Sequence, residues 1–267
     1  MRIIRYKNDA GGAYGLVEGD SVYQAVGSIF ASPRRGNLVG KLADLHLLAP
    51  CEPPKIISVG ANYRDRCIEN NLPIPDIPGR GDTFRVPLRS LVGSGAYIRI
   101  PDDPMRIEYG AELAVVLKKA ARNVPVEAIK DYILGFSCLN NVWGKLPKHI
   151  KMVTLPQSFD GSCPVGPMIV TDINPRDLAI RSIVNGEVRQ NSRTSQMIFD
   201  AYTVTAYVSA LLPLEPGDVI QTGTPGGVAT LKDGDVVTIE IEGIGSITNH
   251  VKGAGRPAED TPRIGRK

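Results

Sequence analysis

The sequence predicts an α+β fold that is mostly β, with a small N-terminal β domain. Short strand-like runs separated by turn signals fill the first 50 residues, and further short strand patterns recur up to residue 241. Helical periodicity is confined to two stretches, 125–134 and 198–212. The regular alternation of strands and helices that is typical of a doubly wound sheet is missing. A few helices on a predominantly β scaffold are therefore expected.

The N-terminal domain is predicted over residues 1–50 as a small meander. Strand patterns at 1–6, 14–17 and 21–23 alternate with turn-forming segments rich in Gly, Asn and Asp. Pro50, Pro53 and Pro54 then interrupt the chain and indicate a boundary near residue 50. The main domain is predicted over residues 51–253. Residues 254–267, rich in Gly, Pro and charge, are predicted to be a flexible tail.

The main domain opens with a buried strand at 55–59 that delivers Gly60, Ala61 and Asn62 to the interior. Residues 69–82 hold three prolines and two glycines without periodicity, which predicts an irregular loop that acts as a lid or lies inert on the surface. A short helix is expected at 125–134, and a longer one at 198–212 has an apolar stripe. Further strands are expected at 111–117, 167–171, 181–184, 218–222 and 236–241.

Composition and charge exclude several classes of protein. The 267 residues are 42% hydrophobic, which permits a sizeable core, and the net charge of +3 comes from scattered basic residues. Neither a nucleic-acid partner nor a membrane surface is therefore expected. The four cysteines form no CxxC pair, which argues against a disulfide framework and a thiolate zinc site. With no visible targeting or membrane segment, a cytoplasmic protein is expected.

The common catalytic motifs are absent, and two loops have either a functional or a purely structural role. The sequence has no P-loop, serine nucleophile elbow, HExxH or GxGxxG motif, and its three histidines lie at no metal-ligand spacing. Residues 217–228 run from a strand into a loop of glycines and threonines, which is either an anion cradle or a tight turn. Residues 158–167 either wall a pocket or reverse the chain.

Taken together, several segments resemble the fumarylacetoacetate hydrolase family. They occur in the family's order over residues 55–251: KIISVGANYRDR at 55–66, IEYGAELAVVL at 107–117, SFDGSCPVGP at 158–167 and LEPGDVIQTGTPGGV at 214–228. The resemblance implies mixed β-sheets rolled into a sandwich around the active site, and usually a homodimer. It also implies a small-molecule substrate, because family members cleave or isomerise dicarbonyl and 2-keto acids.

The family's usual metal site is incomplete in this sequence. Most members hold Mg²⁺ or Mn²⁺ through the two Glu of an E-x-E pair and a following Asp, and the cation polarises the substrate's dicarbonyl unit. The matching positions here are Gly110, Glu112 and Asn141, so one carboxylate of the three remains. Glu108 lies one step away on the same strand face and is disfavoured as a replacement ligand. The resemblance therefore predicts no metal ligands and no cofactor.

Other family positions are also changed, whereas the substrate-cradling segments are kept. The catalytic His and Glu of the family correspond to Arg66 and Glu69, and an active-site Lys corresponds to Gln157. An Arg corresponds to Lys145, which follows an unusual Trp143. The resemblance thus gives Glu69, Arg66, Glu112 and Lys145 as catalytic candidates, and Asn62, Tyr63, Asn141, Trp143, Gln157, Gln190, Thr222, Gly223 and Thr224 as substrate-binding candidates.

Three functions follow from this pattern. The first is a metal-independent enzyme, active in secondary metabolism, that isomerises, dehydrates or cyclises a dicarbonyl or polyketide-like small molecule. Arg66, Lys145 and Gln157 would then stabilise an enolate, with Glu69 or Glu112 carrying the proton. The second is a catalytically inactive binding or dimerisation protein. The third is a metal-dependent acylpyruvate hydrolase or oxaloacetate decarboxylase with a rebuilt Mg²⁺ or Mn²⁺ site.

Overall fold

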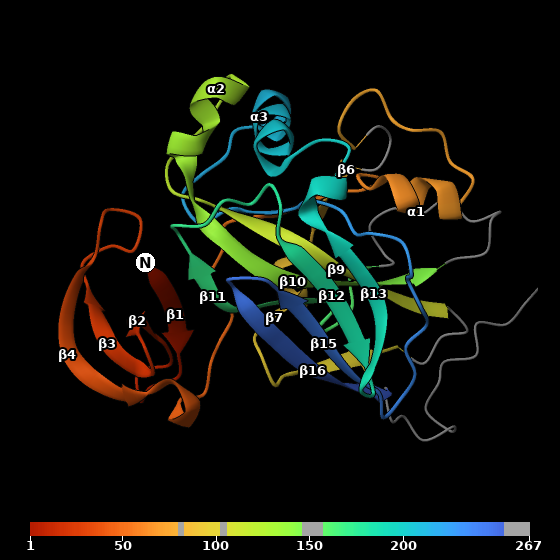
Figure 1. The fold of residues 1–267 in the computed structure, drawn as a ribbon. Coiled ribbons are helices and arrows are strands. Elements are labelled where there is room, and N and C mark those ends of the chain that lie inside the picture. Colours follow the sequence, from red (N-terminus) through yellow and green to blue (C-terminus); the bar gives the residue numbers. More distant parts are fainter. Residues whose placement is uncertain (80–82, 102–105, 146–156, 254–267) are drawn as a thin grey trace, which may run out of the picture.

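A computed structural model describes residues 1–79, 83–101, 106–145 and 157–253, and the predicted tail at 254–267 lies outside this part (Figure 1). The prediction of a mostly β fold is confirmed. The described strands form an 11-stranded mixed sheet and a five-stranded sheet. Helix α2 (Val126–Ile129) and helix α3 (Ala201–Leu211) lie side by side at the top of the molecule in Figure 1. Among the described residues, no helix is long and apolar enough to cross a membrane.

The large sheet is continuous from the N-terminal meander into the main body of the protein. Its strand order is β4-β3-β2-β1-β11-β10-β9-β14-β5-β6, with β7 paired to β11 off this path. The first strand joins the two parts, because β1 pairs antiparallel with β11. The bounds are β1 Arg2–Tyr6, β2 Ala13–Glu18, β3 Ser21–Val26, β4 Arg34–Lys41, β5 Ile56–Val59, β6 Thr83–Val86, β7 Leu91–Val92, β9 Arg106–Leu117, β10 Ile133–Lys145, β11 Cys163–Val170 and β14 Val219–Gln221.

The central pair of the large sheet is β9 and β10, which are much longer than the other strands. They run antiparallel, with Gly110 opposite Asn141 and Glu108 opposite Trp143. Both strands are buried along nearly their whole length. Residues alternate between the two faces of a strand, so Glu108, Gly110 and Glu112 share one face. This shared face becomes the floor of the candidate site.

The smaller sheet packs against the middle of the large one. Its order is β13-β12-β15-β16-β8, and its strands contact β9, β10 and β11. Buried aliphatic side chains such as Leu113, Ile180 and Ile239 fill the space as part of one hydrophobic cluster. Burial of these apolar side chains stabilises the packing of the two sheets. The bounds are β8 Tyr97–Ile100, β12 Ala179–Val184, β13 Glu187–Arg193, β15 Val236–Ile241 and β16 Gly245–Gly253.

The helices match the predicted positions with shifted ends. The helix predicted at 198–212 is α3, Ala201–Leu211, and it begins where the Asp200 carboxylate accepts a hydrogen bond from Thr203 N at 2.8 Å. The helix predicted at 125–134 is shorter, because Ile133 already begins β10. A further helix lies just after β5. The bounds are α1 Arg64–Glu69 and α2 Val126–Ile129, with short 3₁₀ turns η1 Leu42–Asp44, η2 Leu88–Ser90, η3 Lys130–Tyr132 and η5 Thr194–Gln196.

Candidate active site

The candidate site forms where β14 separates from β9. The two strands pair from Val219, opposite Val116, to Gln221, opposite Ala114. After Gln221 the chain turns away from β9 into the Gly- and Thr-rich loop 222–230. The backbone groups of β9 that β14 no longer pairs form hydrogen bonds with other residues instead. Thr222 Oγ1 donates to Leu113 O at 2.8 Å, and Ala111 N donates to Gln190 Oε1 at 2.9 Å. The loop is thus anchored alongside the strand that carries the acidic residues.

Glu112 lies at the inner end of the site and is 2% exposed. Asn141 Nδ2 donates to its Oε1 and Gly223 N donates to its Oε2, each at 2.7 Å. Gly223 has φ +93°, and a Cβ there would lie 2.8 Å from Asn62 Cβ, so glycine is required at this turn. Each carboxylate oxygen therefore accepts an N–H donor.

These residues do not match the carboxylate trio that the resemblance implies for a divalent cation. Gly110 offers no ligand, and a Cβ built there would lie 2.4 Å from Thr224 Oγ1. The side-chain amide of Asn141 donates a hydrogen bond to Glu112. A hydrogen-bond donor therefore lies against the carboxylate oxygen that a cation would need as its ligand. Across the described ranges, no three His, Cys, Asp or Glu side chains gather as a metal site requires.

Glu108 lies at the outer end of the same strand face, with its side chain 3% exposed. Three cations surround its carboxylate. Arg106 pairs directly with Oε1, Lys145 Nζ lies 3.3 Å from the same oxygen, and Arg66 Nη2 lies 3.8 Å from Oε2. A buried carboxylate is costly unless it is paired, so these cations compensate its loss of hydration. Glu108 is thus the centre of a charged cluster.

Helix α1 carries two of the predicted catalytic residues, Arg66 and Glu69, and their side chains form an ion pair. Arg66 Nη1 and Glu69 Oε2 lie 2.8 Å apart, one helical turn from each other. Glu69 Oε1 also accepts a hydrogen bond from Gly227 N at 3.3 Å, in the loop that follows β14. Arg66 therefore connects α1 to Glu108, and Glu69 connects α1 to the Gly-rich loop.

Three predicted substrate-binding residues have buried polar atoms without a hydrogen-bond partner among the described residues. They are Tyr63 Oη, Asn141 Oδ1 and Gln157 Oε1. Burial, followed by the negative charges of Glu112 and Asp65, raises the pKa of Tyr63 well above 10.0. Its phenol therefore keeps its proton at neutral pH and is available as a donor. Buried polar atoms that lack partners are expected at sites where a ligand completes the hydrogen bonding.

Other predicted substrate-binding side chains have all or most of their hydrogen bonds occupied by the protein. Asn62 donates to Phe199 O and Thr222 O and accepts from Phe199 N, all within 3.0 Å. Gln190 Nε2 donates to Thr224 Oγ1 at 2.9 Å and to Pro225 O at 2.8 Å. These contacts hold the loops in place, and a direct role in substrate binding stays a prediction. Trp143, opposite Glu108 on β10, is half-buried.

Sequence reasoning missed the role of two charged residues on β9. Arg106 was not singled out, and Glu108 was considered only as a replacement metal ligand. The signal was present, because Arg106, Glu108, Gly110 and Glu112 alternate along one strand. What the sequence did not show is that α1 and the end of β10 bring Arg66 and Lys145 to the same carboxylate.

The fold and the site define a class: a mixed β protein with a polar, acidic face on a buried antiparallel strand pair. Residues 55–252 match the family described as fumarylacetoacetate (FAA) hydrolase C-terminal, and residues 1–50 match the family described as Rv2993c-like, N-terminal. The chain therefore belongs to the fumarylacetoacetate hydrolase family, as the resemblance predicted.

Relatives in this family carry several names. The chain is 37% identical to protein Rv2993c of Mycobacterium tuberculosis, over 96% of this chain and 100% of that protein. It is 40% identical to oxaloacetate tautomerase fahd2, mitochondrial, of Xenopus laevis, over 78% of this chain and 69% of that protein. Its fold resembles the crystal structure of 2-hydroxyhepta-2,4-diene-1,7-dioate isomerase from Mycobacterium marinum, with TM-score 0.87 and 36% identity over 96% of this chain and 100% of that one.

Proposed function

We propose that this protein is an isomerase that shifts a proton between carbon and oxygen in a 2-oxo or dicarbonyl acid without a resident divalent cation. One observation carries the proposal. The carboxylate left from the family's metal site, Glu112, is engaged by two N–H donors, Asn141 Nδ2 and Gly223 N. A keto–enol shift needs a positioned base and a donor at the carbonyl oxygen, and it needs no water and no bond cleavage between carbons.

Glu112 is the base in this mechanism. Its carboxylate takes a proton from the carbon next to the substrate carbonyl. The electron pair of that C–H bond forms the C=C bond of the enol, and the carbonyl oxygen becomes the enolate oxygen. Tyr63 Oη, protonated and without a partner among the described residues, donates to this oxygen. The proton on Glu112 then passes to the enolate oxygen, which completes the enol.

The outer cluster would bind the substrate's carboxylate. Its cations Arg66, Arg106 and Lys145 carry +3 against −2 from Glu108 and Glu69, which leaves +1 for an anionic ligand. Glu108 and Glu112 are four residues apart on one strand, a span of about 13 Å. In this arrangement the charged end of the substrate would lie at the cluster and its reacting carbon toward Glu112.

The comparisons support the isomerase class and leave the substrate to experiment. An oxaloacetate tautomerase and a dioate isomerase are both similar to this chain. Oxaloacetate is therefore the first substrate to test.

The experiment follows the conversion of enol-oxaloacetate to the keto form by ultraviolet absorbance, with and without EDTA. We expect catalysis that EDTA leaves unchanged and that Glu112→Gln lowers by about 10²–10⁴-fold, the usual contribution of a general base. Glu187→Gln, a surface carboxylate paired with Arg189, is the matched control and should retain full activity.

Three outcomes would contradict the proposal. Activity that EDTA abolishes and Mn²⁺ restores would indicate a metal-dependent enzyme, with hydrolysis or decarboxylation assays as the next step. Absence of turnover with oxaloacetate and with longer 2-oxo dicarboxylic acids would favour the binding-protein alternative. Cleavage of pyruvate from an acylpyruvate would assign the chain to the hydrolases instead.

A further inference from the structure

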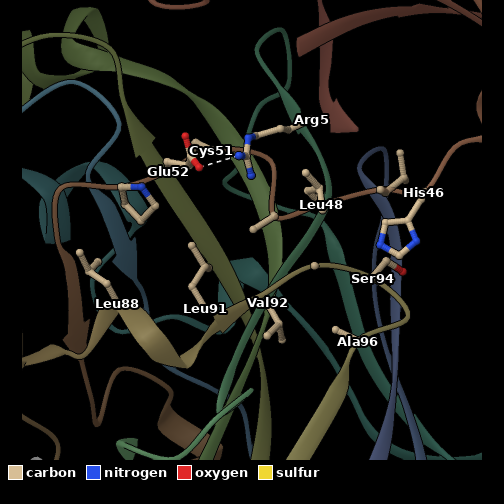
Figure 2. A pocket seen from close by; sticks show the side chains of 14 residues that line it. Arg5, His46, Leu48, Cys51, Glu52, Leu88, Leu91, Val92, Ser94 and Ala96 are labelled. Atoms are coloured by element: carbon tan, nitrogen blue, oxygen red, sulfur yellow. Dashed lines mark hydrogen bonds and ion pairs between the residues drawn. The ribbon is translucent and has the colours of Figure 1, made fainter. Parts of the chain in front are cut away.

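A pocket lies away from the candidate site, between the N-terminal meander and the main body of the protein. Its volume is about 470 Å³, within the roughly 300–1,000 Å³ that is typical of small-molecule pockets. Strand β1 contributes Arg5, residues 46–53 form a second wall, and η2 and β7 with the residues that follow form a third (Figure 2).

One side of this pocket is charged and the rest is largely apolar. Arg5 provides a permanent positive charge, and its Nη2 lies 2.5 Å from Glu52 Oε1. In Figure 2 this ion pair is drawn above Leu91 and Val92. Cys51 next to it is 2% exposed, and burial raises its pKa to about 12, so it adds a neutral thiol surface. The apolar side chains are Leu47, Leu48, Leu88, Leu91, Val92 and Ala96.

The two partners of the ion pair differ in how firmly they are held. The Arg5 side chain is 17% exposed, and Gly12 lies so close that a Cβ there would be 2.8 Å from Arg5 Nη2. The Glu52 side chain is 72% exposed. An ion pair with one solvated partner contributes little to stability, so Glu52 can turn into solvent at small cost. Arg5 would then present its planar pair of N–H donors to the pocket.

We propose that this pocket binds a small monocarboxylic acid with a short apolar body, whose carboxylate replaces Glu52 on Arg5. A carboxylate matches the fork of a guanidinium in two parallel hydrogen bonds. A single permanent cation in the lining favours one negative charge over the two of a phosphate monoester. The leucine and valine walls accept the hydrocarbon part and remove it from water.

The wall of this pocket is directly linked to the segment that carries Gln157. Ser90, which ends η2 beside the pocket, donates through Oγ to Gln157 O at 3.0 Å. The next residues, Leu91 and Val92, pair with Cys163 and Pro164 of β11. A ligand in the pocket would therefore contact an element that also holds the candidate active site.

Hexanoate is the probe for this pocket, and hexanamide is its neutral match in size. Isothermal titration calorimetry on the full chain should show hexanoate binding at least tenfold more tightly than hexanamide and than acetate, which lacks the apolar body. Glu52→Gln removes the competing carboxylate and should tighten hexanoate binding several-fold. Arg5→Gln should abolish it, whereas Lys7→Gln, one exposed cation further along the chain, should leave it unchanged.

Ala96→Leu provides a variant that does not depend on the ion pair, because it fills the pocket while leaving Arg5 intact. It should weaken hexanoate binding at least tenfold. The proposal is overturned if hexanoate binds neither the wild type nor Glu52→Gln, if Arg5→Gln binds it unchanged, or if acetate binds as tightly as hexanoate. The last result would mean a surface anion contact only.

Discussion

Glu112 and Glu108 lie four residues apart on the same face of β9, yet different groups among the described residues contact them. Glu112 accepts hydrogen bonds from the neutral N–H groups of Asn141 and Gly223. Glu108 is surrounded by the charges of Arg66, Arg106 and Lys145. Both carboxylates are almost fully buried. The difference therefore comes from the segments that meet each end of the strand.

This contrast fits two different roles for the carboxylates, one as a base and one in an anion-binding cluster. Neutral donors hold a carboxylate without cancelling its charge, which suits the role of base that we propose for Glu112. Cations around Glu108 neutralise it and leave a net positive cluster, which suits the recognition of an anion. Three changes would break or sharpen the comparison, and they follow in order of decreasing expected effect.

Asn141→Asp should have the largest effect on stability, because it places a second carboxylate against Glu112 Oε1, 2.7 Å from the present amide nitrogen. Loss of the donor leaves a buried acceptor without its partner and adds like-charge repulsion. We expect destabilisation of about 3–5 kcal/mol, as when a buried charge loses its partner. Urea unfolding measures this loss.

The same variant tests whether the site around Glu112 binds a divalent cation, because two facing carboxylates attract a cation. Added Mn²⁺ should recover part of the stability of Asn141→Asp while leaving the wild-type unfolding midpoint unchanged. Equal stabilisation of the two proteins by Mn²⁺ would contradict the proposed use of Glu112.

Glu108→Gln should destabilise the protein by about 1–3 kcal/mol, because it removes the shared partner of three cations. The loss is smaller than for Asn141→Asp, since Arg106 and Lys145 are 57% and 50% exposed and are partly hydrated. Arg106→Gln is the matched control and should cost about 0–1 kcal/mol, as exposed ion pairs do. Equal losses for both variants in urea unfolding would show that Glu108 is not the centre of the cluster.

Tyr63→Phe should change the alkaline pH dependence of stability. The pKa of Tyr63 is raised in the folded protein, so its contribution is complete below the unfolded value near pH 10 and is lost as the pH rises toward the folded pKa. The titration of one proton changes the free energy of unfolding by at most about 1.4 kcal/mol per pH unit. We expect the wild type to lose stability more steeply than Tyr63→Phe above pH 10, as measured by urea unfolding. Parallel curves would place the phenol in a solvated environment.

Local patterns predicted several of the strands and the main helix. The predicted strand at 236–241 coincides with β15, and the apolar stripe at 198–212 contains α3. Periodicity did not reveal β10, for which the sequence predicted no strand. Its residues 133–145 are buried on both faces, so no alternation of polar and apolar side chains marks it as a strand.

The candidate site could be predicted only as a set of positions. Motif positions pointed to Arg66, Glu69, Glu112 and Lys145, and the structure places Arg66 and Lys145 on the one carboxylate that the prediction had set aside, Glu108. Their catalytic roles stay predictions. No spacing in the sequence could show that Asn62 and Gln190 have their side chains committed to backbone and loop contacts.

The sequence by itself determined the mostly β fold, the family and the presence of Gly110 and Asn141 at two positions where the resemblance implies carboxylates, because turn residues, strand patterns and motif identities are local properties. Tertiary structure alone decided which partners meet each carboxylate. Asn141 and Gly223 reach Glu112 from positions 29 and 111 residues away. Contacts over such separations depend on strand register and loop closure, which no local pattern encodes.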